Sequence, residues 1–121
     1  MSAVLLGVAG VVPAHAEGSW SSYISAWQPG DESRRWTDGN RDSVKTSVRF
    51  RGCESDGGGG FRKAQLKLWR DVFGPDKHQG TRTNTCKTST WKDVSKGTYY
   101  FELWGVWNGG FLWVDSVTTK Y

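Results

Sequence analysis

The chain carries few of the residues that nucleophilic or acid–base catalysis requires. Residues 17–121 contain one histidine, His78, in a segment rich in Gly, Pro and Asp. A Ser-His-Asp relay needs a base beside a nucleophile and a third group that orients the base, and no nucleophile-elbow sequence is present. Glu102 and Asp115 are candidates for a glycosidase carboxylate pair, but any small β-protein offers many such acids. We therefore expect no catalytic residues and no enzyme activity.

Metal binding is also not expected. Oxygen-bearing side chains alternate through residues 38–42 as they do at the start of a calcium-binding loop. The EF-hand pattern then fails, because Ser43 stands where Gly is needed and Arg49 where Glu is needed. This segment is interpreted as a polar turn, with a non-EF calcium site left open. A structural zinc site needs four ligands, more than the cysteines and His78 supply, so the sequence predicts no metal and no cofactor.

Tryptophan is the unusual feature of the composition, with 8 among 121 residues. A small core can enclose roughly two or three such large side chains, so several others are expected to be at least partly exposed. Trp69 is the clearest case, because its neighbours on one predicted strand face are polar or charged. Exposed indoles suit sugars, since the C–H face of a pyranose stacks on the ring, and they also suit bases and protein partners.

Basic side chains accompany these aromatic residues. The formal net charge is +4, which is mildly basic and gives no dedicated nucleic-acid motif. The outward positions of two predicted strands carry five cations, Lys45, Arg49, Arg51, Lys63 and Lys67. If the two strands are neighbours, these cations and Trp69 form one face suited to an anionic polymer. The alternative is an ordinary solvated sheet face.

These observations predict a binding domain. The expected ligand-binding residues are aromatic and basic: Trp69, Trp104, Trp107, Trp113, Lys45, Arg49, Arg51 and Lys67. The expected function is that of a secreted, non-catalytic domain that binds a polysaccharide, either a glycan or an anionic polymer of the cell envelope. The alternative is a secreted protein-directed factor, such as a hydrolase inhibitor or a toxin-like effector, that presents residues 57–60 and 108–110 to a protein partner.

Export is predicted from the start of the chain. Residues 1–16 contain an apolar run without Asp, Glu, Lys or Arg and end in Ala14-His15-Ala16, which fits a signal-peptidase site. The run is too short to cross a bilayer as a helix. The usual basic start is missing, so this secretory signal peptide is interpreted as incomplete at its start. Residues 17–121 are then expected to form a single extracellular β-domain without a transmembrane segment, and Cys53 and Cys86 to form a disulfide.

Alternation of apolar and polar residues places the first strands. Residues 44–51 alternate cleanly, which is typical of a half-buried strand. The glycine run at residues 57–60 predicts a loop. Residues 61–71 alternate again and are interpreted as a strand, with a helix as the alternative. Residues 19–27 could add a strand, and residues 75–96 suggest loops with one short strand.

The end of the chain predicts a hairpin. Residues 98–104 and 111–117 are rich in aromatic and β-branched side chains, and Asn108-Gly109 between them suits a tight turn. The register of this hairpin is left open. The stretch from Gly97 to Val117 resembles the last two strands of jelly-roll carbohydrate-binding modules, which implies a similar fold. We expect an all-β fold of about five to seven short strands, a small antiparallel β-sandwich (jelly-roll-like) or a barrel, with one disulfide.

Overall fold

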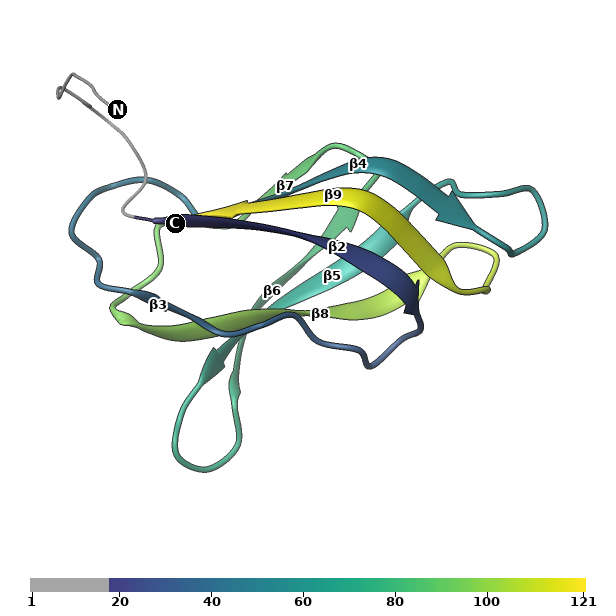
Figure 1. Cartoon of the computed structure of the whole chain (residues 1–121). Helices are drawn as coiled ribbons and strands as arrows, with labels where there is room; N and C mark the ends of the chain where they lie inside the picture. The colour runs from purple at the N-terminus through teal and green to yellow at the C-terminus, as the bar shows by residue number, and fades with distance from the viewer. Residues whose placement is uncertain (1–17) are drawn as a thin grey trace, which may run out of the picture.

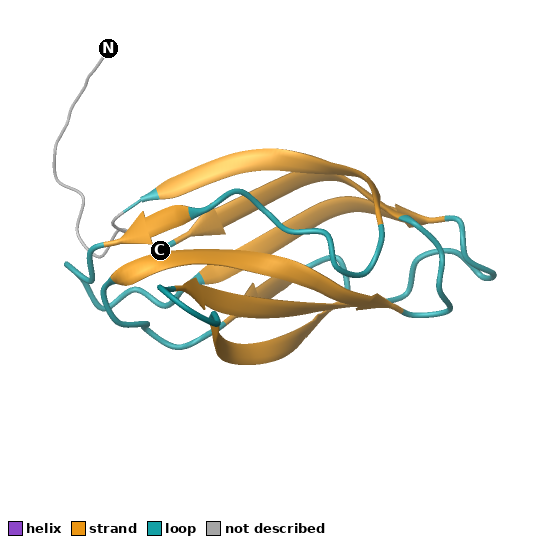
Figure 2. Cartoon of the chain, turned by 90° about the horizontal axis from the view of Figure 1, so that it is seen from below, coloured by secondary structure: helices purple, strands orange, loops and turns teal. Residues whose placement is uncertain are grey.

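The computed structural model describes residues 18–121, so the predicted signal peptide lies outside the described residues. Residues 18–121 form eight strands: β2 (Ser19–Trp27), β3 (Trp36–Asp38), β4 (Ser47–Ser55), β5 (Ala64–Asp71), β6 (Lys77–Asn84), β7 (Thr88–Thr90), β8 (Gly97–Val106) and β9 (Leu112–Lys120). Figure 2 shows these strands joined only by loops and turns. No helix that could span a membrane occurs among the described residues.

The strands form two four-stranded antiparallel sheets that pack face to face (Figure 1). The strand orders are β2-β9-β4-β7 and β3-β8-β5-β6. Only β5 and β6 are consecutive strands of one sheet, and every other connection crosses from one sheet to the other. This is the connectivity of a jelly roll. The predicted sandwich is confirmed, and the barrel alternative is wrong because the two sheets remain separate.

The core lies between the sheets and follows the alternation of the sequence. In β4, Val48 and Phe50 are buried and Arg49 is exposed, as the pattern predicts. In β5, Leu66 and Leu68 are fully buried, and the segment is a strand rather than a helix. Successive side chains of a strand point to opposite faces of the sheet, so every second residue points into the core.

The tryptophans divide as the composition predicts. Trp20, Trp36 and Trp91 are buried in the core. Trp27, Trp69 and Trp113 are half-buried, whereas Trp104 and Trp107 are 50% and 42% exposed. The core therefore encloses three indoles, and the remaining five reach the surface to some extent.

The predicted hairpin between β8 and β9 is wrong. β8 pairs with β3 and β5, whereas β9 pairs with β2 and β4 in the opposite sheet. The turn itself has the expected backbone, because Asn108 and Gly109 both have φ of 71°. The chain nevertheless crosses the sandwich there, so that the apolar sides of β8 and β9 face each other across the core. Trp104 and Glu102 on β8 therefore do not lie opposite Trp113 or Asp115 on β9.

Residues 75–96 contain two strands where one was predicted. β6 is eight residues long and pairs along most of its length with β5. Its sequence gives no apolar alternation, because β6 is an edge strand whose side chains are mostly exposed or half-buried. Backbone hydrogen bonds to β5 hold it in place instead of core contacts.

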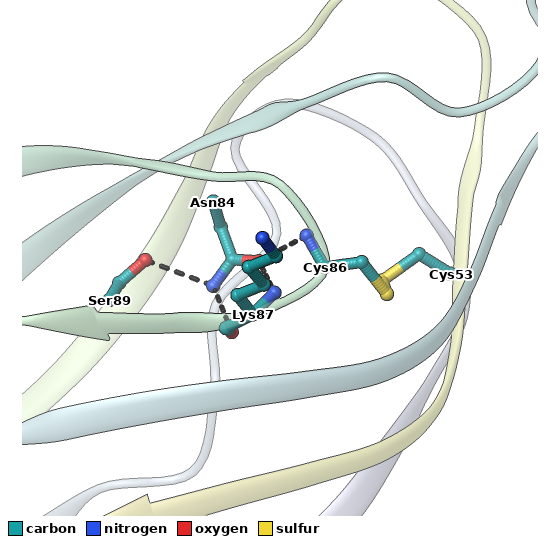
Figure 3. The surroundings of a disulfide bond; sticks show 5 residues. All are labelled: Cys53, Asn84, Cys86, Lys87 and Ser89. Carbon is teal, nitrogen blue, oxygen red and sulfur yellow. Dashed lines mark hydrogen bonds between the residues drawn. A yellow bond between two sulfur atoms is a disulfide. The ribbon is translucent and has the colours of Figure 1, made fainter.

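The Cys53–Cys86 disulfide is present, with the Cα atoms 5.9 Å apart, and it indicates an oxidising compartment. It joins β4 to the turn between β6 and β7 (Figure 3). Cys86 has a φ of 66°, and the buried Asn84 holds this turn. The Asn84 Oδ1 accepts the Cys86 and Lys87 N–H groups at 2.8 and 3.1 Å, and its Nδ2 donates to the Lys87 carbonyl and the Ser89 hydroxyl, both at 2.9 Å.

Candidate functional site

The outer surface of the β3-β8-β5-β6 sheet carries two exposed indoles and several polar side chains. We call this surface the aromatic face and define it by Gln65, Lys67, Trp69, Glu102, Trp104, Gly105 and Trp107. The antiparallel register of β5 and β8 builds it. Lys67 lies opposite Glu102, and Gln65 lies opposite Gly105. Residues directly opposite each other in an antiparallel pair lie on the same face of the sheet, so these four positions share the outer face.

Lysine and indole contacts order the centre of the aromatic face. The Lys67 Nζ lies 3.1 Å from the centroid of the Trp104 ring and 5.7 Å from that of Trp69. Such cation–π contacts are attractive because the ring face carries negative charge. The Trp69 Nε1–H also donates to the Glu102 Oε1 at 2.7 Å. Lys67 thus lies between the two indoles and covers one face of the Trp104 ring.

A β-bulge at Trp104 shifts the alternation of β8, so that Gly105 lies opposite the outward-facing Gln65. Leu66 pairs with Leu103 and Gln65 pairs with Gly105, so Trp104 is an extra residue in β8. Bulges re-aim side chains near binding sites in many β-proteins. Leu103 is fully buried, and Trp104 directly after it is 50% exposed.

A hollow of about 170 Å³ lies next to Trp104 on the same sheet. Its lining consists of Lys63, Gln65, Gly105, Val106 and Trp107. Gly105 leaves the floor open, since a Cβ there would meet only the Gln65 Oε1, at 4.0 Å. The hollow therefore combines an exposed indole, an amide and an ammonium group, which can stack on a sugar ring and hydrogen-bond to its hydroxyls.

A network of polar residues borders the aromatic face where the segment before β3 and the loop between β5 and β6 meet at Tyr100 of β8. The Tyr100 hydroxyl donates to the Asp76 Oδ2 at 2.5 Å, and the Arg35 guanidinium carbon lies 3.9 Å from the Tyr100 ring centroid. Arg35 also forms ion pairs with Glu32 at 3.0 Å and with Asp71 at 3.2 Å. These contacts hold the base of the loop between β5 and β6 against the sheet. The rest of the loop projects from the sandwich (Figure 1).

The burial of Tyr100 and its hydrogen bond to Asp76 are expected to make the free energy of unfolding depend on pH in the alkaline range. Burial, followed by the hydrogen bond to Asp76, raises the pKa of Tyr100 well above its usual value of 10. The folded state therefore holds the phenol proton more tightly than the unfolded state, and this stabilisation is present below pH 10 and is lost as pH rises above it. We expect Tyr100→Phe to show a shallower loss of unfolding free energy above pH 10 than the wild type.

Urea unfolding at several pH values on either side of pH 10 measures this difference. Tyr99 also has a raised pKa, mainly because it is buried, but it is unchanged in the variant and contributes equally to both curves. Parallel curves for wild type and Tyr100→Phe would contradict the assignment. At neutral pH the variant is expected to lose about 1 kcal/mol with the hydrogen bond.

The structure brings together only part of the predicted binding set. Lys67, Trp69 and Trp104 lie together on the aromatic face, and Trp107 lies at its end. Arg49, Arg51 and Trp113 belong to the opposite sheet, and Lys45 lies in the segment that precedes β4. The single cationic face considered for β4 and β5 does not form, because these strands are in different sheets.

Two other sequence hypotheses are tested by position. Glu102 and Asp115 lie on strands of different sheets, so they do not make a carboxylate pair across one cleft. In the 38–42 segment, the Asp38 and Asp42 carboxylates accept the Asn40 and Val44 N–H groups at 2.8 and 2.9 Å, as in polar turns. Residues 18–121 contain no group of three or more His, Cys, Asp or Glu arranged to hold a metal.

Sequence reasoning missed three members of the face. Glu102 alternates with Trp104 along β8, so strand periodicity offered a signal that they share a face. Gln65 alternates with Lys67 in the same way. Gly105 gave no signal, because its role comes from the bulge and from the hollow that its missing side chain leaves open.

Comparisons with protein families, with curated proteins and with solved structures yield no match for this chain. The aromatic face itself is therefore the basis for a functional proposal.

Proposed function

We propose that the chain is a secreted, non-catalytic domain that binds an uncharged glycan on the aromatic face. The observation that carries the proposal is the pair of exposed indoles, Trp104 and Trp107, beside the hollow over Gly105. Neighbouring exposed indoles form an apolar patch of the kind that marks binding sites, and the face of a sugar ring can cover an indole while its hydroxyls remain hydrogen-bonded.

Polar groups around the indoles match the rim of a sugar ring. The Glu102 Oε1 orients Trp69, and its second oxygen makes no hydrogen bond with any described residue. That oxygen is available to accept from a sugar hydroxyl. Gln65 and Lys63 at the hollow add an amide and an ammonium group that donate hydrogen bonds. The arrangement offers stacking for affinity and hydrogen bonds for orientation.

Filling the hollow tests the proposal. Gly105→Val places a side chain over the floor, where a Cβ meets no atom closer than 4.0 Å, and β-branched residues suit strands. We expect the variant to fold and to bind glycan about tenfold more weakly, because a loss of about 1.4 kcal/mol of stacking and contact corresponds to that factor. Trp104→Ala removes a stacking platform and is expected to weaken binding by a similar factor.

The measurements are pull-down on insoluble uncharged polysaccharides such as cellulose, chitin, xylan and mannan, and titration of tryptophan fluorescence with soluble fragments. Thr37→Val is the matched control, since Thr37 is an exposed residue of β3 in the same sheet and pairs with Thr98, at the opposite end of β8 from Gly105. Absence of binding and of any spectral change across the panel would refute the proposal. Equal weakening by Thr37→Val would place the site elsewhere.

A protein-directed factor is the second candidate, and one observation favours it. Phe73 is fully exposed in the loop between β5 and β6, which projects from the sandwich (Figure 1). The loops first considered for this role pack on each other instead, since the Phe111 N–H donates to the Asp56 Oδ1 at 2.7 Å and Gly57 lies against Asn108. Residual activity of purified hydrolases mixed with the domain separates this candidate from glycan binding.

A further inference from the structure

The outer surface of the β2-β9-β4-β7 sheet carries a second, chemically different group of side chains. We call it the cationic face, a hollow of about 350 Å³ lined by Ser47, Arg49, Arg51, Thr88, Ser116, Thr118 and Lys120. Its lining contains three cations, four hydroxyls, no carboxylate and no aromatic ring. The aromatic face lies on the other sheet, and the two faces share no residue.

The register of β4 and β9 places each cation opposite a side chain that carries a hydroxyl group. Ser47 lies opposite Lys120, Arg49 opposite Thr118, and Arg51 opposite Ser116. On its other side Arg49 lies opposite Thr88 of β7. Directly opposite side chains of an antiparallel pair have Cβ atoms about 5 Å apart. Each cation therefore has a hydroxyl neighbour close enough for both to contact one anionic group.

The cations of this face have no partner among the described residues. Arg49, Arg51 and Lys120 are exposed, and across residues 18–121 none of the three forms an ion pair or donates a side-chain hydrogen bond. Three like charges on one small surface repel each other, and an anion bound between them relieves that repulsion. Guanidinium groups also bind sulfate and carboxylate oxygens through two parallel hydrogen bonds.

We infer that the cationic face binds an anionic polysaccharide, whose charged groups contact Arg49, Arg51 and Lys120 and whose hydroxyls contact the serine and threonine side chains. Arg49 and Arg51 are two residues apart on β4, so their attachment points are about 7 Å apart along the strand. A chain with regularly spaced anionic groups can contact both. The lining has no aromatic ring for base stacking and no apolar residue for insertion into a membrane, which favours a polysaccharide over nucleic acid or lipid.

Dextran sulfate and uncharged dextran of equal length test the inference, because they differ only in the anionic groups. The wild-type domain is expected to bind dextran sulfate more tightly than dextran, and the affinity for dextran sulfate is expected to fall as NaCl rises from about 0.05 to about 0.5 M. Arg49→Gln combined with Arg51→Gln is expected to weaken binding to dextran sulfate about tenfold, since each exposed contact contributes modestly.

The matched control removes the same charge from a different place. Lys77→Gln combined with Lys96→Gln alters two exposed lysines, one on β6 of the opposite sheet and one in the loop before β8. Equal weakening by both double variants would show an effect of net charge alone and would overturn the inference. Tighter binding to single-stranded DNA or to anionic lipid vesicles than to dextran sulfate would also overturn it. Neither result bears on the aromatic face, whose ligands in the first assay are uncharged.

Discussion

Replacement of both cysteines by serine (Cys53→Ser with Cys86→Ser) is expected to lower the free energy of unfolding by about 4 kcal/mol. The two residues are 33 positions apart, and the bridge removes the conformational freedom of that loop from the unfolded chain. In the folded domain the bridge ties β4 to the turn between β6 and β7, and so anchors a connection that crosses the sandwich.

Urea unfolding of the wild type and the double variant, each with and without a reductant, measures this contribution. The reductant is expected to destabilise the wild type to the level of the variant and to leave the variant unchanged. Asn84 is unaltered in both proteins and keeps its hydrogen bonds to the turn, so the comparison isolates the covalent link. A double variant that unfolds at the wild-type urea concentration would contradict a stabilising role for the bridge.

Truncation of Phe101 to alanine is expected to cost about 4 kcal/mol of unfolding free energy. Phe101 is only 1% exposed, and it packs against aromatic rings from other strands. Its ring centroid lies 6.2 Å from that of Trp20, 5.9 Å from that of Trp27 and 6.4 Å from that of Phe50. These partners belong to β2 and β4, so Phe101 on β8 links the two sheets, and alanine would leave a cavity between them.

The same substitution at an exposed site is the control. Phe73→Ala is expected to change the unfolding free energy by no more than about 0.5 kcal/mol, because Phe73 is fully exposed. Phe101→Leu keeps most of the volume and is expected to cost roughly 1 kcal/mol, which provides a folded protein if the alanine variant does not fold. Similar losses for Phe73→Ala and Phe101→Ala would contradict the central place of Phe101 in the core.

Loss of Phe101 also affects the aromatic face through the backbone of β8. Phe101 precedes Glu102, and the bulge at Trp104 follows after the buried Leu103. Inward packing of Phe101 and Leu103 holds this stretch of strand, and the outward side chains depend on it. Stability and glycan binding are therefore expected to fall together in Phe101→Ala, whereas Gly105→Val affects binding alone.

Local patterns in the sequence determined which side of β4 and of β5 is buried. The alternation around Val48 and Leu66 predicted the core positions of β4 and β5 correctly, because side chains of a strand point to opposite faces in turn. The tryptophan content exceeded what a small core can enclose, so the volume of the indole side chains was enough to predict that some of them are exposed. The disulfide was predicted from two cysteines that follow a predicted export signal, and the structure contains it.

Only the tertiary structure decided which strands are neighbours. Alternation shows that a strand has a buried side, but it does not show which other strand lies beside it in the sheet. The turn at Asn108 and Gly109 has the backbone that a hairpin needs, yet it connects two sheets because β8 and β9 find their hydrogen-bond partners elsewhere. Pairing of strands distant in sequence depends on closure of the whole fold, which no local pattern encodes.

The separation of the binding residues follows from the same cause. Arg49 and Lys67 occupy outward positions of consecutive strands, and the sequence allowed them to share one face. Because β4 and β5 lie in opposite sheets, one cation joins a group of hydroxyls and the other is held between two indoles. The sequence determined the composition of the surface, and the crossing of the chain between sheets decided that it carries two distinct faces.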